Sequence, residues 1–340
     1  MERFIWTVEQ IEEACARSAP PSFDRYPNDV PALTMSQTFY PLGFPLEIRT
    51  NSEEVLQQSR IKWEMFEKRF DTDPIVAEIH VIESASIDCP PLPQYHFFDN
   101  RMVVTADSAN VCTVEFPNGK TRMVVSTAAL RHTDYFRQAF LDCAAACQIA
   151  TRHATGIHAA CVALNGRGVL LCGDSGAGKT SLSWACAQAG WDFLADDTVH
   201  MLHSQQRRIV IGNSHQVRFR PTAAELFPEI AGAAMTPRHF GKPSIEIPTA
   251  PMANVNTREC AHVDFIVFLS RRKPGAAELV PYSRDVARCY MRQWLFGTPE
   301  TKSVQHAAVE RLLTAPILEL RYERLHWGVE RLEHLVREGK

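Results

Sequence analysis

A glycine-rich stretch near the middle of the chain combines three glycines with a lysine and a threonine. It reads Gly173-Asp-Ser-Gly-Ala-Gly-Lys-Thr180, which is the pattern Gly-x-x-x-x-Gly-Lys-Thr. Glycines at this spacing let the backbone curl so that successive N–H groups face an anion, and a following helix adds its positive N-terminal end. The pattern therefore predicts that a polyphosphate such as that of ATP binds here. The alternative, a chance glycine-rich turn, fits poorly with a position between an apolar strand and a helix.

Two side chains of this loop have chemistry of their own. Lys179 can neutralise the outer phosphates, and the hydroxyl of Thr180 can bind Mg²⁺. We expect the nucleotide to contact the whole loop and the first helical residues, namely Gly173, Asp174, Ser175, Gly176, Ala177, Gly178, Lys179, Thr180 and Ser181.

Two adjacent carboxylates follow the loop after a single predicted helix. Asp196 and Asp197 lie 17 and 18 residues beyond Lys179, at the end of the strand-like segment 191–197. One crossover connects the two segments, so the carboxylates should emerge beside the loop. One carboxylate can then hold Mg²⁺ through water while the other accepts the proton of an attacking hydroxyl. The alternative is an exposed acidic turn or a helix cap.

A histidine and two arginines complete the set of candidates. His158 opens a strand that pairs with the strand entering the loop, so it can reach the same end of the sheet, although an isolated histidine among apolar residues is often structural. Arg218 and Arg220 are two residues apart in segment 213–230, and on a strand both would face one side. They could bind the γ-phosphate or an anionic acceptor. The alternative is a surface strand with solvated arginines.

The order of these residues resembles the catalytic core of the HPr kinase/phosphorylase family. A strand with His158 is followed by a short turn, the phosphate loop, a helix and Ala-Asp-Asp. The resemblance is specific over about 158–200, weaker to about 270, and not detected before 130. It implies a phosphoenolpyruvate-carboxykinase-like nucleotide fold with ATP and Mg²⁺. The roles it implies are acid/base catalysis for Asp196, a place near the transferred phosphoryl group for His158, and metal binding for Asp197, with the order within the pair left open.

The chain also departs from this family. The glycine-rich segment that captures the family's substrate is not evident after the Asp pair, and segment 213–230 stands in its place. The acceptor is therefore open: a serine of a peptide or protein, or a small molecule with a hydroxyl group. Phosphorolysis is equally open. We assign Arg220 to the catalytic set with Asp196, His158 and Lys179, because an arginine can stabilise charge on a transferring phosphoryl group.

The remaining sequence indicates the elements that position these residues. We expect an α+β N-terminal domain over 1–130 that helps to recognise the acceptor, with helices over 7–17 and 52–70 and strands over 45–50 and 75–83. A buried helix over 133–152 occupies the linking segment 131–154. The domain over 155–340 is expected to be an α/β P-loop kinase core of mixed β-sheet and helices. A tight turn at Asn165-Gly166 and a helix end at Gly190 are expected within it.

Composition narrows the function classes. The 340 residues are 45% hydrophobic and 22% charged. Their net charge of −3 disfavours a protein that coats nucleic acid, because such proteins have a basic surface. No run approaches the ~20 apolar residues of a membrane helix, and the N-terminus lacks an apolar signal core. We therefore expect a cytoplasmic protein without nucleic-acid or membrane partners, whose ten scattered cysteines stay reduced. Whether it forms a homo-oligomer is open.

The leading hypothesis from sequence is an ATP- and Mg²⁺-dependent kinase acting on a hydroxyl group. The alternative is a non-catalytic ATP-binding regulatory or scaffold protein, which does not need Asp196, Asp197 and His158 together. An ATPase coupled to motion is a third hypothesis, but we find neither a separate magnesium-binding strand nor an arginine-finger pattern.

Overall fold

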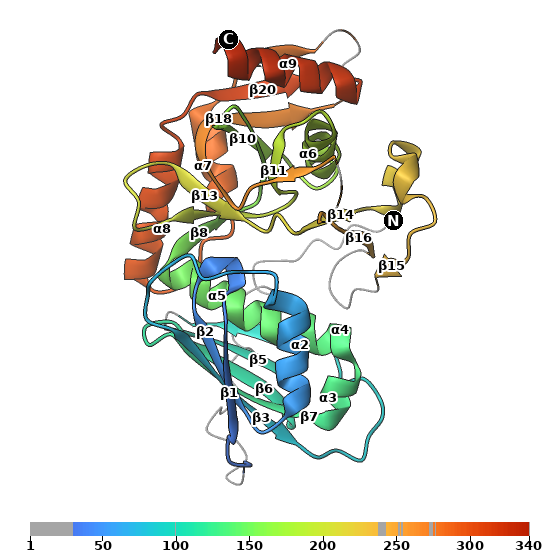
Figure 1. Ribbon diagram of the computed structural model, residues 1–340. Helices are drawn as coiled ribbons and strands as arrows, with labels where there is room; N and C mark the ends of the chain where they lie inside the picture. Colours follow the sequence, from blue (N-terminus) through green and yellow to red (C-terminus); the bar gives the residue numbers. More distant parts are fainter. Residues whose placement is uncertain are drawn as a thin grey trace, which may run out of the picture.

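Two large sheets, one in each half of the chain, form the framework of the protein (Figure 1). The computed structural model describes residues 30–98, 100–236, 243–250, 252, 254–271, 275 and 277–339. The helix predicted over 7–17 lies outside these residues. The fold class expected from the sequence, an α/β core of mixed sheet and helices preceded by an α+β region, is confirmed.

The N-terminal half is built on a seven-stranded sheet with the order β1-β2-β3-β7-β6-β5-β4. Strands β2, β3 and β7 run parallel to one another, and the other pairs are antiparallel. The strands are β1 (Met35–Phe39), β2 (Leu46–Thr50), β3 (Ile75–Ile82), β4 (Gln94–Phe97), β5 (Arg101–Asp107), β6 (Asn110–Glu115) and β7 (Lys120–Ser126). The strands predicted over 45–50 and 75–83 are thus present as β2 and β3.

Helices cover one face of this sheet. They are α2 (Glu53–Trp63), α3 (Thr127–Arg131), α4 (Thr133–Phe136), the π-helical turn η2 (Arg137–Leu141) and α5 (Asp142–Arg152), and a short 3₁₀ turn, η1 (Pro41–Gly43), follows β1. The last three helices follow one another without a break, so the helix predicted over 133–152 is present with a π turn inside it. Buried aromatic side chains such as Phe136 and Phe140 attach it to the core.

The helix predicted over 52–70 is shorter than expected, because α2 ends at Trp63. Beyond it, the backbone N–H groups of Arg69 and Phe70 both donate to the carbonyl of Gly43. The ring of Phe70 stacks on that of Phe44 with centroids 4.2 Å apart. A continued helix would carry Phe70 away from this contact, so tertiary packing overrides the helical pattern.

The C-terminal half is built on a ten-stranded mixed sheet. Eight strands follow the order β17-β11-β9-β10-β18-β13-β12-β8, and β20 joins β18 and β19 at the side. The central strand β10 is antiparallel to β9 and parallel to β18. The strands are β8 (Ala154–Ile157), β9 (Ala160–Leu164), β10 (Arg167–Cys172), β11 (Asp192–Ala195), β12 (Val199–Leu202), β13 (Ile209–Gly212), β17 (Asn256–Thr257), β18 (Cys260–Ser270), β19 (Glu278–Pro281) and β20 (Ile317–Arg321).

Alternating side chains of this sheet bury both of its faces. Leu171 of β10 packs with Leu182 and Leu332 from helices α6 (Lys179–Gln188) and α9 (Leu325–Glu338). Its neighbour Leu170 packs on the other face with Met291 and Leu312, from α7 (Arg284–Arg292) and α8 (Pro299–Leu312). A strand between two helical layers must be apolar throughout, which explains the run Val-Leu-Leu-Cys before the phosphate loop.

A small third sheet packs against α6. It consists of β14 (Gln216–Phe219), β16 (Ser244–Pro248) and β15 (Met235–Thr236), in that order, with 3₁₀ turns at η3 (Pro221–Glu225) and η4 (Pro228–Ile230). Trp184 of α6 makes edge contacts with Phe193 and Phe219, whose ring centroids lie 6.2 and 5.6 Å away. This cluster fixes the strand that carries Arg218 beside the phosphate loop.

The predicted turns are confirmed. Asn165 and Gly166 connect β9 to β10 with φ angles of 52° and 79°, the left-handed pair that a tight hairpin turn requires. Gly190 follows α6 with φ of 89°, as expected for a residue that ends a helix. Both signals are local, and the backbone follows them.

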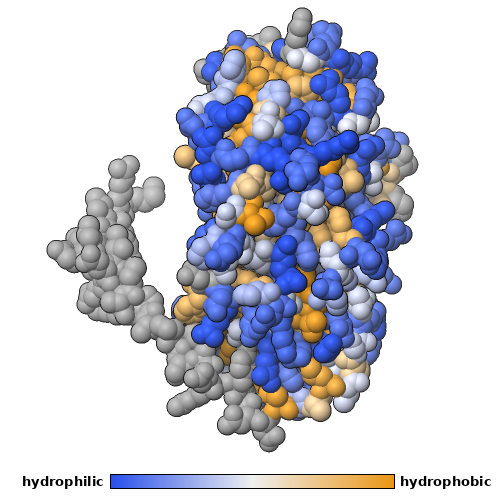
Figure 2. Space-filling model, turned by 90° about the vertical axis from the view of Figure 1, so that its left-hand side faces the viewer, coloured by the Kyte–Doolittle hydropathy of each residue, from blue (hydrophilic) through white to orange (hydrophobic). Residues whose placement is uncertain are grey.

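Helix α5 lies between the two large sheets and joins the halves (Figure 1). Gln305 of α8 donates to the carbonyl of Ala150 at 3.0 Å, and Phe44 stacks on His153 with centroids 4.6 Å apart. The face in Figure 2 is mostly hydrophilic, with apolar residues in smaller patches. None of the helices in the described part of the chain has the length and hydropathy needed to cross a bilayer.

Candidate active site

The glycine-rich loop connects the end of β10 to the start of α6, as predicted. Its glycines adopt φ angles of 143° (Gly173), 95° (Gly176) and 101° (Gly178), which side chains strongly disfavour. A Cβ atom on Gly173 would lie 2.8 Å from that of Ala177, and one on Gly178 would lie 3.0 Å from the hydroxyl of Tyr322. The loop is therefore a cradle that only glycine permits, with the N-terminus of a ten-residue helix behind it.

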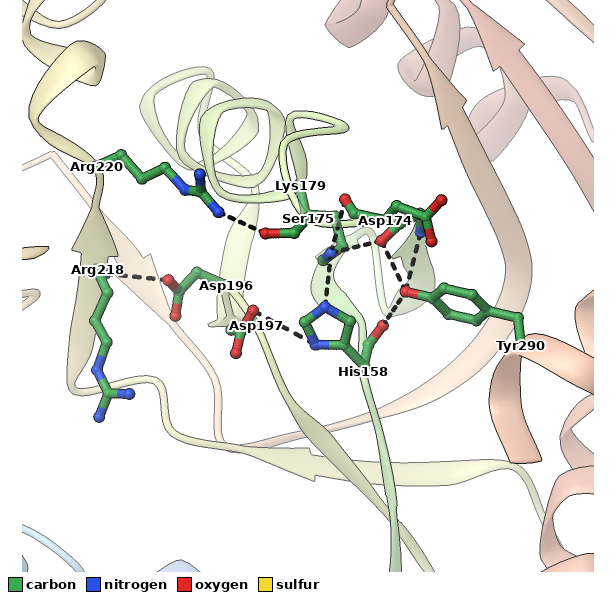
Figure 3. A network of polar contacts seen from close by, with 10 residues as sticks. His158, Asp174, Ser175, Lys179, Asp196, Asp197, Arg218, Arg220 and Tyr290 are labelled. Atoms are coloured by element: carbon green, nitrogen blue, oxygen red, sulfur yellow. Dashed lines mark hydrogen bonds and ion pairs between the residues drawn. The ribbon is translucent and has the colours of Figure 1, made fainter. Parts of the chain in front are cut away.

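Lys179 lies at the centre of the site (Figure 3). Its side chain is buried, and its ammonium group donates to the carbonyl of Gly173 at 2.6 Å. The same nitrogen lies 3.0 Å from Nε2 of His158. Burial lowers the pKa of Lys179, while the nearby Asp197 opposes that change. The ammonium group is thus held between the start of the loop and His158.

His158 lies in the connection between β8 and β9 and bridges Lys179 to Asp197. Its Nε2 atom faces the ammonium group, and its Nδ1 atom lies 3.5 Å from Oδ1 of Asp197. Because an ammonium group can only donate, Nε2 must accept and we assign the ring proton to Nδ1. Burial, together with Lys179, lowers the pKa of His158, which agrees with a neutral ring. His158 thus lies at the phosphate end of the sheet, but it precedes β9 (Ala160–Leu164) and does not open that strand as expected.

The two carboxylates differ in environment. Asp196 follows β11, is only 8% exposed, and accepts a hydrogen bond from the backbone N–H of Arg218 at 3.1 Å. Burial raises the pKa of Asp196 to about 6, and the N–H and guanidinium groups of Arg218 only partly oppose this. The side chain of Asp197 is 56% exposed. One carboxylate is therefore buried with a raised pKa, and the other is open to solvent.

The two arginines take different directions in Figure 3. Arg220 reaches over the phosphate loop, and its guanidinium group donates to the hydroxyl of Ser175. Arg218 instead extends away from the loop, and its guanidinium group lies 3.6 Å from Oε1 of Glu246 on the neighbouring strand β16. The prediction that both arginines face one side of a strand is wrong, because β14 ends at Phe219 and Arg220 lies beyond it.

Tyr290 on α7 is a site residue that sequence reasoning missed. Its hydroxyl lies 2.7 Å from the carbonyl of His158 and 2.8 Å from that of Gly173, and it accepts from the N–H of Gly173 at 3.2 Å. It thereby connects the start of the phosphate loop to the histidine segment. Only the packing of α7 on the sheet brings it there, and no local motif marks it.

A cavity of about 750 Å³, a size in the range of small-molecule sites, is lined by His158, Lys179, Asp196, Asp197, Arg218 and Arg220. Thr180 and Ser181 also line it, and Arg271 lines it close to Gly178 of the loop. The glycine cradle and the adjacent cation suit a polyphosphate. In the described part of the chain, no cluster of three or more His, Cys, Asp or Glu residues could hold a metal ion. The Thr180 hydroxyl and the Asp197 carboxylate in the cavity wall are oxygen groups of the kind that Mg²⁺ prefers as ligands.

Comparison with known proteins agrees with the resemblance found in the sequence. Residues 148–220 match the family model of the HPr Serine kinase C-terminal domain, so this chain is HPr kinase-like over the segment that runs from α5 to Arg220. Among solved structures, it is similar to the HPr(Ser) kinase/phosphatase from Coxiella burnetii, with 13% identity, a TM-score of 0.29, and coverage of 54% of this chain and 93% of that chain. No curated protein matches the sequence.

Proposed function

We propose that this protein is a kinase that transfers the γ-phosphoryl group of ATP, with Mg²⁺, to a hydroxyl group. The acceptor is a serine of a peptide or protein, or a small molecule. The observation that carries the proposal is the common cavity of Lys179, Asp196 and Asp197. Phosphate binding alone needs the loop and its lysine. A buried carboxylate with a raised pKa beside an open one suits proton transfer as well.

In this proposal the loop holds the nucleotide. The N–H groups of residues 174–180 and the ammonium group of Lys179 bind the polyphosphate. A phosphate oxygen is a stronger acceptor than the carbonyl of Gly173, so Lys179 exchanges that contact when the nucleotide binds. Thr180 and Asp197 would hold Mg²⁺, which would supply positive charge to neutralise the phosphates.

Asp196 acts as the base. The acceptor oxygen forms a bond to the γ-phosphorus atom while the bond between that phosphorus and the bridging β,γ-oxygen breaks, and the hydroxyl proton passes to the carboxylate of Asp196. A pKa of about 6 leaves most of this carboxylate ionised at pH 7, yet makes it more basic than an ordinary aspartate.

Arg220 and His158 assist the groups already named. The guanidinium group of Arg220, which already contacts Ser175 of the loop, offers donors to the transferring group. His158 keeps Lys179 and Asp197 at a fixed separation, because its two ring nitrogens face one each. A neutral ring does so without adding charge to the site.

Incubation with γ-labelled ATP, Mg²⁺ and a cell extract tests the proposal. The wild-type protein should label an extract component. Asp196→Asn should bind ATP in equilibrium dialysis but lose transfer, whereas Lys179→Ala should lose much of its ATP affinity as well. Asp285→Asn, which changes an exposed carboxylate on α7, is the matched control and should behave as wild type.

The same assay separates the competing functions. Label that appears only as free phosphate, at equal rates with and without extract, indicates an ATPase. ATP binding without turnover by the wild-type protein indicates a regulatory or scaffold protein. Either result would overturn the kinase proposal.

A further inference from the structure

A second cavity, of about 520 Å³, opens next to the nucleotide cavity and shares part of its wall. Asp196, Asp197 and Arg218 line both cavities. The phosphate loop lines the first, whereas the second lies between helices α2 and α5 of the N-terminal half and strands of the C-terminal half. We call this second cavity the interlobe cleft. A molecule in it reaches Asp196 without entering the space of the phosphates.

The N-terminal half gives the interlobe cleft an apolar wall. Ile61 and Met65 lie at its exposed part and are 52% and 47% exposed, although most large apolar side chains of this half are buried. Other apolar side chains continue the wall inward, namely Leu42, Trp63, Phe66, Ala145, Ala146 and Ile149. Exposed apolar side chains on a concave surface next to a reactive carboxylate are suited to hold an apolar ligand group.

The charged side chains of the cleft are mostly paired with one another. Lys62 contacts Asp142 at 2.8 Å, and Arg137 contacts Asp134 at 2.6 Å. The third pair is Arg218 with Glu246, at 3.6 Å.

These pairs leave an excess of negative charge. Among the described residues that line the cleft, three cations face five carboxylates, so Asp196 and Asp197 remain after pairing. Asp197 is assigned to Mg²⁺ in the proposed function, so an anionic group next to the reacting hydroxyl would meet the carboxylate of Asp196. It would also have to break an existing ion pair to gain a cation. Repulsion and desolvation both oppose that.

We propose that the interlobe cleft is the acceptor site, and that it takes a hydroxyl compound with apolar groups beside the hydroxyl and no negative charge. The proposal rests on the kinase function proposed above. A serine flanked by apolar residues in a peptide and a small apolar alcohol share this chemistry. The cleft presents the hydroxyl group to Asp196, and the apolar wall of the N-terminal half selects the acceptor molecule that bears this hydroxyl.

Model acceptors test the chemical class. The peptide probes are acetyl-Ala-Leu-Ser-Leu-Ala-amide and its acidic counterpart acetyl-Ala-Glu-Ser-Glu-Ala-amide. The small-molecule probes are the uncharged alcohol 4-methyl-1-pentanol and its anionic counterpart 4-hydroxybutyrate. With labelled ATP and Mg²⁺, the better apolar probe should have a kcat/KM at least about tenfold above its anionic counterpart. The peptide and alcohol arms show which source the cleft accepts. Equal or faster transfer to the anionic probes, or neither binding nor transfer with the apolar ones, overturns the proposal.

A matched pair of variants tests the location. Ile61→Glu places a charge on the apolar wall and should raise the KM for the preferred apolar probe about tenfold while leaving the KM for ATP unchanged. Val304→Glu makes the same kind of change at an equally exposed position on α8 and should change neither value. An unchanged acceptor KM in Ile61→Glu removes the cleft from the acceptor site.

A binding measurement separates this proposal from the kinase proposal. A fluorescent peptide with alanine in place of serine reports occupation of the cleft by anisotropy, without any transfer. Binding that Ile61→Glu weakens, with no labelled product from any probe or extract, refutes the kinase function but supports the cleft as a ligand site. Asp196-dependent labelling of an extract component, with a KM that Ile61→Glu leaves unchanged, supports the kinase and refutes the cleft as acceptor site.

Discussion

Replacing Asp196 by asparagine should stabilise the ligand-free protein at neutral pH while it abolishes transfer. Asp196 is 8% exposed, and burial raises its pKa from 3.8 to about 6. Ionising Asp196 therefore costs more free energy in the folded protein than in the unfolded chain. The difference of about two pKa units corresponds to ~3 kcal/mol. Asparagine has nearly the same shape and can still accept the N–H of Arg218. Because it carries no charge, the free energy of unfolding should rise by up to ~3 kcal/mol.

The effect should depend on pH, in a direction set by the raised pKa. Below about pH 4 the carboxylate is neutral in both the folded and unfolded states, so wild type and variant should be equally stable. Between about pH 4 and 6 it ionises in the unfolded chain but resists ionisation in the folded protein, so the wild type loses stability relative to the variant. Above that range the difference should stay constant.

Urea unfolding of both proteins without nucleotide, at a series of values from about pH 4 to 8, measures this difference. Asp197→Asn is the matched control. Its side chain is 56% exposed, so its stability should change by less than about 0.5 kcal/mol. A stability difference between wild type and Asp196→Asn that does not vary with pH, or a less stable variant at pH 8, would refute the reasoning.

Three further results are expected. The rate of transfer should fall as pH drops below about 6, because the proposed base Asp196 becomes protonated, and kcat measured across this range checks it. Tyr290→Phe removes the hydroxyl that bonds Gly173 and should weaken ATP binding in calorimetry by about 1–2 kcal/mol, with Tyr282→Phe as a control that leaves it unchanged. Gly178→Ala forces a side chain into a backbone with φ of 101° and against the Tyr322 hydroxyl at 3.0 Å, and should lower ATP affinity at least about tenfold. Adding Tyr322→Phe should restore part of that loss, and no recovery at all would mean that backbone strain alone is responsible.

The parts of the site that the sequence predicted are those held by local structure. The phosphate loop and the Asn165-Gly166 turn need backbone angles that glycine and asparagine favour, so the residue types alone predict both features. Only one crossover connects the loop to Asp196 and Asp197. Such a short connection restricts where the end of that strand can lie, so the sequence predicts both carboxylates beside the loop. His158 followed from the hairpin, because pairing of β9 with β10 determines which residues lie at the loop end.

The parts that the sequence did not predict depend on contacts between distant segments. Tyr290 lies 117 residues from Gly173 and reaches it only because α7 packs on the sheet. The pairing of Arg218 with Glu246 is set by the register of β14 on β16, which are separated by a long connection. The early end of α2 depends on stacking of Phe70 on Phe44. Side-chain periodicity carries no information on such contacts, so these features need the fold.

The contacts of Lys179 couple nucleotide binding to the state of His158. The ammonium group of Lys179 donates to Nε2 of His158 and contributes to the lowered pKa of the ring. A polyphosphate in the loop offers charged oxygens, which attract the ammonium group more strongly than the imidazole does. Once Lys179 turns to them, the ring loses a neighbouring cation and its remaining partner is the carboxylate of Asp197. We therefore expect nucleotide binding without Mg²⁺ to raise the pKa of His158, because a Mg²⁺ ion at Asp197 would act in the opposite direction.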